Sequence, residues 1–174
     1  MVAATLALAS CGSSSSSKVS AGSYVKSVCT TATSWYRTIQ IAGRRLQATV
    51  HNSKSLSTDK GAYVHFVDSL LHATQRAEHQ LKSAGIPSVN GGKKISNEVI
   101  NAFDGAQRGL KTAVAQVRKA PTSSSTAFEA AAGHVQSTVQ RALQSMSSLA
   151  PQKNPQLHQA ALKDPSCQRL RALG

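Results

Sequence analysis

Side chains that could do chemistry are few in this chain and lie far apart. Its 174 residues include three cysteines, six histidines and seven carboxylates. No close pair of carboxylates could divide acid and base roles, and neither a Ser-His-acid arrangement nor a nucleophile elbow is visible. The sequence therefore predicts a protein that is not an enzyme and that uses no cofactor.

Three of the histidines, His65, His72 and His79, repeat at intervals of seven. Seven residues of helix rise about 10 Å, which is too far for one ion to bridge neighbouring imidazoles. Asp68 and His72, four residues apart, could hold a weakly bound surface ion with His65 one turn back. Three solvent-facing imidazoles that gain charge in acid are the simpler interpretation, so we predict no metal site.

The cysteines lack the spacing of a metal site. Cys11 lies between a short apolar run and a run of serines, which leaves Cys29 and Cys167 as a candidate pair. A disulfide between those two persists only in an oxidising compartment. The amino terminus therefore bears on how the pair is interpreted.

The opening residues combine a short apolar run with a cysteine. Residues 2–9 are apolar but much shorter than the about 20 residues that span a bilayer, as is typical of the end of a signal peptide. Residues 8–11, Leu-Ala-Ser-Cys, resemble the lipobox of bacterial lipoproteins. The resemblance implies that Cys11 receives a diacylglycerol, becomes the first mature residue and anchors the protein to the outer face of the cell membrane.

We accordingly expect three segments along the chain. Residues 1–10 would be the remnant of a signal peptide, residues 11–23 the lipidated cysteine with a Gly/Ser tether, and residues 24–174 a helical domain. A signal peptide normally carries a basic residue before its apolar run, and none is present here. We therefore expect more of the signal upstream of Met1.

Apolar residues recur at alternating steps of three and four along four segments, a pattern typical of amphipathic helices in a bundle. The expected helices cover residues 20–51, a segment with its seam from Tyr63 to Ala84, residues 93–120, and a segment with its seam from Phe128 to Leu149. Gly85 predicts the end of the second helix, and the spacing of Thr126 and Glu129 predicts a capping box at the fourth. We predict an all-α, up-down-up-down four-helix bundle.

That topology makes a demand on the carboxyl terminus. The end of the fourth helix must return to the end of the bundle where the first helix begins, so Cys167 can reach Cys29 and close the bundle with one disulfide. Asn154-Pro155 and Asp164-Pro165 each look like an N-cap followed by proline. We expect one short helix over 155–163 and fraying of the last residues, 168–174 (QRLRALG).

Basic residues outnumber acidic ones by 20 to 7, which gives a net charge of +13. Lys26, Arg37 and Arg44 share one helical face, Arg45 follows them, and the first acidic residue is Asp59. Such a surface attracts anionic lipids and envelope polymers, although a solvated, acid-poor face is the simpler interpretation. Nucleic acid is not predicted as a partner, because no nucleic-acid-binding motif accompanies the charge.

Small residues leave a second function open. Gly105 and Gly109 on the third helix, and residues 130–133 (Ala-Ala-Ala-Gly) on the fourth, could let two backbones approach closely. They could equally leave an apolar ligand pocket between helices. The glycines and lysines of residues 90–94 lack the ending of a phosphate loop and are predicted to be a helix connector.

Several of these features occur together in one known group of proteins. The tethered lipobox cysteine, a cysteine in the first helix, AGIPSVNGGKKI at 84–95 and DPSCQ at 164–168 resemble small helical lipoproteins and secreted proteins of high-GC Gram-positive bacteria. The resemblance implies a fold and a location and carries over no active site. We hypothesise a lipoprotein that binds anionic envelope components or a protein partner; the alternative is a carrier or sensor of a small apolar ligand.

Overall fold

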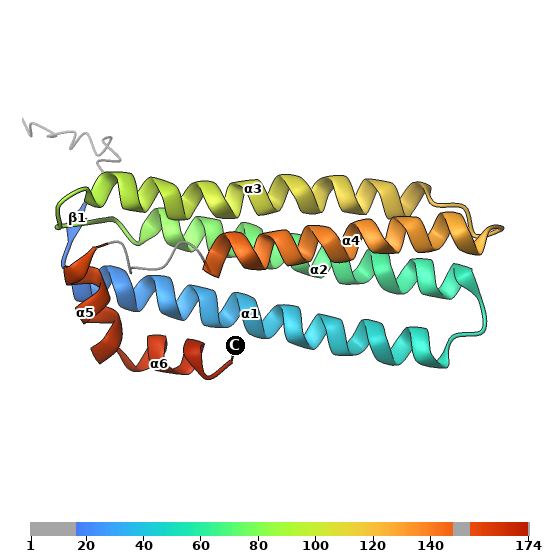
Figure 1. The fold of residues 1–174 in the computed structure, drawn as a ribbon, viewed down its shortest axis with the longest axis horizontal. Helices are drawn as coiled ribbons and strands as arrows, with labels where there is room; N and C mark the ends of the chain where they lie inside the picture. Colours follow the sequence, from blue (N-terminus) through green and yellow to red (C-terminus); the bar gives the residue numbers. More distant parts are fainter. Residues whose placement is uncertain (1–16, 148–153, 174) are drawn as a thin grey trace, which may run out of the picture.

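The computed structural model describes residues 17–147 and 154–173, which form helices joined by short connections. The helices are α1 (Ala21–Asn52), α2 (Leu56–Ser83), α3 (Gly92–Lys119), α4 (Ser125–Ser147), α5 (Pro155–Lys163) and α6 (Pro165–Arg171). Helices α1 to α4 run up and down beside one another, and α5 and α6 pack against α1 (Figure 1). The predicted all-α four-helix bundle is confirmed.

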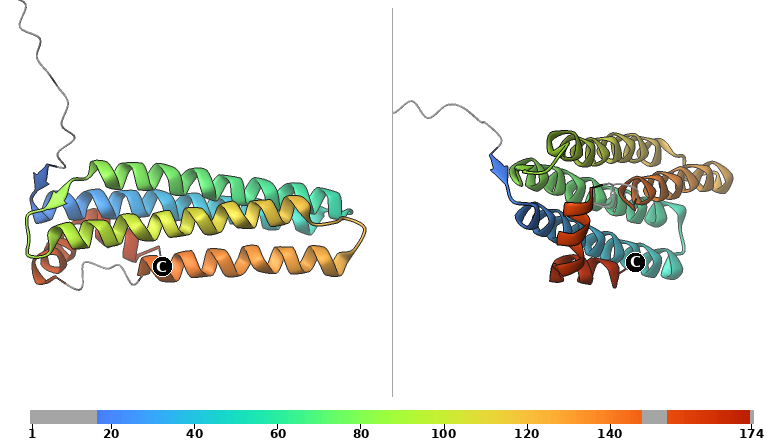
Figure 2. Two further views of the ribbon diagram at one scale, coloured as in Figure 1. Left: turned by 90° about the horizontal axis from the view of Figure 1, so that it is seen from above. Right: turned by 60° about the vertical axis from the view of Figure 1, so that its left-hand side comes forward.

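The two ends of the bundle are distinguished below by what they contain. At the disulfide end, α1 and α3 begin, α2 and α4 end, and α5 and α6 lie nearby (Figure 2). At the hairpin end, the connections from α1 to α2 and from α3 to α4 turn the chain back.

The core follows the predicted seams most closely on α3. The apolar seam that the periodicity predicts there is buried throughout, at Val99, Phe103, Ala106, Leu110, Ala113, Val117 and, just after the helix, Ala120. It meets Val67 and Leu70 of α2 and Val135 of α4. The indole nitrogen of Trp35 donates to Thr74 Oγ1 at 2.9 Å, and the Trp35 ring meets Phe103 edge-on with centroids 5.6 Å apart. Because the buried indole N–H has a hydrogen-bond partner, burying Trp35 leaves no polar group unsatisfied. The hydrogen bond also fixes how α1 and α2 pack against each other in this layer.

Serine caps begin three of the four helices of the bundle, α1, α2 and α4. Ser20 Oγ accepts a hydrogen bond from the backbone N–H of Ser23, and Ser55 caps α2 in the same way. The capping box predicted at Thr126 is wrong, because α4 begins two residues earlier. There, Ser124 Oγ accepts from the backbone N–H of Ala127. The serine-rich loop offers several equivalent hydroxyls, and the sequence did not distinguish among them.

The start of the described chain is fixed by a short pair of strands, β1 (Lys18–Val19) and β2 (Ile86–Pro87), which run parallel. The backbone N–H of Ile86 donates to Ser17 O at 3.0 Å. Residues 18 and 19, which the sequence predicts to be part of the Gly/Ser tether, are instead hydrogen-bonded in this pair of strands. Gly85 ends α2 as predicted, with φ of +82°, and a Cβ there would lie 2.6 Å from Ser17 O.

The carboxyl-terminal segment forms two helices instead of the one predicted. Asp164 ends α5 and caps α6, accepting a hydrogen bond from the backbone N–H of Ser166 at 2.8 Å. The expectation that residues 168–174 fray is wrong up to Arg171, where α6 ends. Pro165 explains the break, because it occupies the first position of a helix and has no N–H to continue α5.

Packing along α1 is uneven. Its buried side chains run from Tyr24 to Ala42, and none of residues 43–52 is buried. Leu46 and Val50 continue the predicted seam but are only half-buried. The carboxyl-terminal ten residues of α1 therefore lack a close partner on the side of α4.

Candidate functional site

The predicted cysteine pair is confirmed. Cys29 of α1 and Cys167 of α6 form a disulfide, with their Cα atoms 4.9 Å apart. Val25 and Leu157, both fully buried, pack around it. The bond holds the carboxyl-terminal helices against the first turns of α1. Cys11, the predicted lipid attachment point, lies outside the described residues.

The basic residues predicted on α1 fall on two different faces. Lys26, Arg37 and Arg44 are exposed and lie on the face of α1 that points away from the core. Arg45 is also exposed but lines a hollow between α1 and α2, together with His65. The α1 segment contains no acidic residue that could neutralise either set.

The structure adds three exposed cations beside α1, on the helices that pack against it, and the sequence analysis missed them. Helix α6 lies along α1, and Lys163, Arg169 and Arg171 of the carboxyl-terminal helices are exposed. We call these three residues, with the three outward-facing residues of α1, the basic face. The disulfide was the available signal, since pairing Cys29 with Cys167 brings their neighbours together.

One carboxylate accompanies these cations, and it is already engaged. Asp164 accepts hydrogen bonds from the hydroxyl and the backbone N–H of Ser166. The Ser166 hydroxyl is the main cause that lowers the pKa of Asp164; burial opposes it, and backbone hydrogen bonds and Lys26 assist. Ser166 Oγ also lies 3.5 Å from Lys26 O, which places Lys26 at the start of α6.

The histidines do not assemble a metal site in the described part of the chain. His65, His72 and His79 are all exposed. Asp68, the carboxylate proposed to share an ion with two of them, instead accepts from Arg118 of α3 at 2.9 Å. Residues 17–147 and 154–173 contain no group of three His, Cys, Asp or Glu side chains that could hold a metal ion.

The small residues of α3 and α4 serve packing at one position. A Cβ on Gly109 would lie 3.1 Å from Thr138 Cγ2, so the two helices approach closely there. Gly105 has only the end of the Arg108 side chain within 4 Å, and Gly133 has open space. None of the three lines the hollows described below.

The predicted connector at residues 90–94 leads into α3. Gly91 adopts φ of +70° as the N-cap, and a Cβ on Gly92 would lie 2.0 Å from Pro87 O. These glycines therefore permit a tight turn against β2, which explains their presence without a phosphate ligand.

A cleft of about 700 Å³ opens between α1, α2 and α4, toward the hairpin end. We call it the α1–α4 cleft. It is lined by Gly43, Leu46, Gln47, Val50 and His51 of α1, Tyr63 and Phe66 of α2, and Val135, Gln136, Val139 and Gln140 of α4. Apolar side chains form its walls and amides stand among them, a composition typical of small-molecule sites.

In the described residues, no helix is both long enough and apolar enough to cross a membrane. No protein-family model, curated protein or solved structure matches this chain.

Proposed function

We propose that this chain is a non-enzymatic binding module, anchored by lipid to the outer face of the cell membrane, whose basic face adheres to anionic envelope components. The lipobox-like residues 8–11 support the anchor. The Cys29–Cys167 disulfide is consistent with that location, because such bonds persist in oxidising compartments.

The uneven distribution of charge carries the proposal. The basic face gathers six exposed cations from α1, α5 and α6, and the one carboxylate in these helices, Asp164, is engaged as a cap. On α2 and α3, by contrast, Lys82, Arg108 and Arg118 are paired with carboxylates. An uncompensated basic surface attracts anionic polymers and headgroups, and a lipid tether raises the local concentration of the module beside them.

Salt dependence tests the adhesion. The full chain carrying Cys11→Ser would be mixed with phosphatidylglycerol vesicles at low and high ionic strength, and sedimentation would measure the bound fraction. We expect binding to fall steeply with salt, because the screening length between exposed charges falls from about 30 Å at 0.01 M salt to about 3 Å at 1 M. Neutral phosphatidylcholine vesicles should bind little.

Charge reversal assigns that binding to one face. Arg37→Glu with Arg169→Glu should weaken vesicle binding at least tenfold. The matched control reverses two exposed cations elsewhere, Arg76→Glu with Lys111→Glu, and should change it less than twofold. Equal losses in the two double variants, or binding that ignores salt, would exclude the basic face as the adhesive surface.

The anchor has a test of its own. Bacterial cells expressing the chain with a lipoprotein signal peptide in front of Leu8 should incorporate labelled palmitate into the protein, and Cys11→Ser should abolish the label. Cys29→Ser leaves the lipobox-like residues intact and should keep it. An unlabelled and unprocessed wild-type protein would exclude lipidation at Cys11.

A second function is favoured by the α1–α4 cleft. Its volume of about 700 Å³ lies within the range of small-molecule sites, and Leu46 and Val50 of α1 offer apolar surface to it. This feature supports the alternative of a carrier or sensor of a small apolar ligand. Gly43→Leu should fill the cleft, whereas Gly133→Leu places the same side chain in open space. Native mass spectrometry should show a co-purified apolar molecule that only Gly43→Leu removes.

A further inference from the structure

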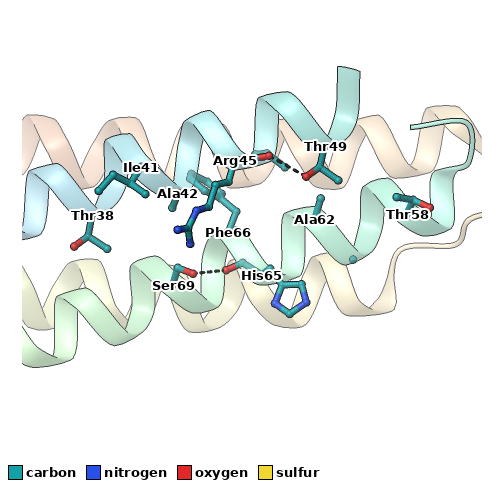
Figure 3. A pocket seen from close by; sticks show the side chains of 12 residues that line it. Thr38, Ile41, Ala42, Arg45, Thr49, Thr58, Ala62, His65, Phe66 and Ser69 are labelled. Carbon is teal, nitrogen blue, oxygen red and sulfur yellow. Dashed lines mark hydrogen bonds between the residues drawn. The ribbon is translucent and has the colours of Figure 1, made fainter. Parts of the chain in front are cut away.

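A groove on the outer side of the α1–α2 pair combines cations with an apolar floor. We call it the α1–α2 groove; its volume is about 590 Å³ (Figure 3). It is lined by Thr38, Ile41, Ala42, Arg45, Leu46 and Thr49 of α1 and by Thr58, Gly61, Ala62, His65, Phe66 and Ser69 of α2. Leu46 and Phe66 also line the α1–α4 cleft, so these two side chains separate the two hollows.

The floor of the groove is formed by apolar side chains. Gly61 and Ala62 of α2 are small and leave space above them, and Ala42 of α1 is buried at the bottom of the groove. Ile41 is 44% exposed, which is unusual for a large apolar side chain in the described part of this protein. Covering Ile41 and Phe66 with an apolar group would remove their exposed apolar surface from water, which favours binding.

Most hydroxyl groups of the groove already donate to the backbone, so a ligand would receive hydrogen bonds mainly from Arg45 and His65. Thr38, Thr49 and Ser69 each donate their hydroxyl hydrogen to a helix carbonyl one turn back, at 3.0, 2.9 and 2.7 Å. Their hydroxyls are therefore committed as donors. The remaining donors are the Arg45 guanidinium and a ring N–H of His65.

No carboxylate within the groove neutralises the charge of Arg45. Its lining contains no Asp or Glu, and none of the ion pairs in the described residues involves Arg45. Figure 3 shows the Arg45 side chain reaching from α1 across the groove toward α2, on the side where His65 and Ser69 lie. A guanidinium presents paired N–H donors that match a carboxylate or phosphate.

We propose that the α1–α2 groove binds a single-chain amphiphile with an anionic head. The carboxylate or phosphate head lies on Arg45, with His65 beside it, and the acyl chain covers Ile41, Ala42 and Phe66. This site is separate from the basic face, because Arg44 and Arg45 point to different sides of α1. It is also separate from the α1–α4 cleft.

The occupant that we propose is a free amphiphile from outside the chain. A lipid on Cys11 would compete with it, so the test below uses the chain carrying Cys11→Ser.

Calorimetric titration of the full chain carrying Cys11→Ser with monomeric oleate tests the proposal. Lysophosphatidic acid with the same acyl chain tests a phosphate head, and monoolein, which has the chain but no charge, tests the need for an anion. We expect one molecule of oleate or lysophosphatidic acid to bind per chain and monoolein to bind at least tenfold more weakly.

Variants place the binding in this groove. Arg45→Gln should weaken binding of the anionic lipids at least tenfold, and the neighbouring Arg44→Gln should change it less than twofold. Ala62→Leu should fill the groove and reduce binding at least tenfold, whereas Gly43→Leu, which fills the α1–α4 cleft, should leave it intact. Equal binding of monoolein and oleate, or equal effects of the two arginine variants, would overturn the proposal.

Discussion

The two ends of this bundle are built in opposite ways. At the disulfide end, Cys29 and Cys167 are covalently joined, Val25 and Leu157 are fully buried, and the β1–β2 pair fixes the entering chain. Two helices beyond the four-helix bundle cover α1 there. The disulfide end therefore combines a covalent link, dense packing and helix caps.

At the hairpin end, α1 has apolar side chains without full cover. The α1–α2 groove and the α1–α4 cleft lie on either side of Leu46 and Phe66. The packed part of this end joins α2 to α3 and α4, where Tyr63 meets Phe128 edge-on with centroids 5.6 Å apart. We infer that the disulfide end supplies stability and that the hairpin end has room for ligands.

Removing the disulfide should lower the stability of the disulfide end more than any other change predicted here. For a sequence separation of 138 residues, the chain-entropy relation gives about 5 kcal/mol as an upper figure. Cys29→Ser with Cys167→Ser should therefore lower the free energy of unfolding by 2–5 kcal/mol, about the range seen for native disulfides, in urea titrations. Hydrogen exchange should rise in α5 and α6, with oleate binding at the hairpin end retained.

A matched pair of valines measures packing at the two ends. Val25 is fully buried near the disulfide, and Val139 is half-buried beside the α1–α4 cleft. Val25→Ala should cost about 2 kcal/mol in the free energy of unfolding, and Val139→Ala less than about 1 kcal/mol. Equal costs would show that the cleft side is packed as tightly as the disulfide end.

The Asp164 cap should contribute a smaller and pH-dependent amount. Asp164→Ala should cost about 1 kcal/mol at neutral pH, a typical value for losing a helix N-cap. The Ser166 hydroxyl lowers the pKa of Asp164 in the folded state, so its contribution is present above the unfolded value of about 3.9 and is lost in stronger acid. Urea titrations at pH 7 and pH 2 should show the variant and wild type converging; a constant difference would contradict this account.

The smallest expected effect is a gain in stability from a substitution at the hairpin end. Gly61 lies within α2 with nothing near its Cβ position, so Gly61→Ala should raise the free energy of unfolding by about 0.5–1 kcal/mol. Gly109→Ala is the control, because its Cβ would press on Thr138 Cγ2 at 3.1 Å and offset the gain. Thermal denaturation compares the two; a larger gain for Gly109→Ala would mean that α3 and α4 approach less tightly than described.

Much of the fold was predictable because helix periodicity is a local property. The seam on α3 gave its buried face residue by residue, and Gly85 marked the end of α2. The disulfide followed from the topology, since an even number of antiparallel helices returns the chain to its starting end. The second carboxyl-terminal helix, α6, was not predicted although Asp164-Pro165 is an N-cap followed by proline. Only the first such pair, Asn154-Pro155, was interpreted as the start of a helix.

The candidate sites were less predictable because each depends on how two helices are rotated against each other. Arg45 and His65 are twenty residues apart on different helices, and nothing in their spacing places them on one groove. The Arg169 side chain joins the basic face because α6 docks on α1. Asp68, by its spacing a candidate metal ligand, is engaged by Arg118 from another helix.

The sequence by itself determined four amphipathic helices, their antiparallel order, a cysteine pair able to close them and an excess of positive charge. These features rest on residue type and on a repeat of three to four residues, which act within a helix. Only the tertiary structure decided where α1 loses its close partners, which cations share a face, and that two hollows flank Leu46 and Phe66. Those outcomes depend on the distances and rotations between helices, which side chains from several segments set together.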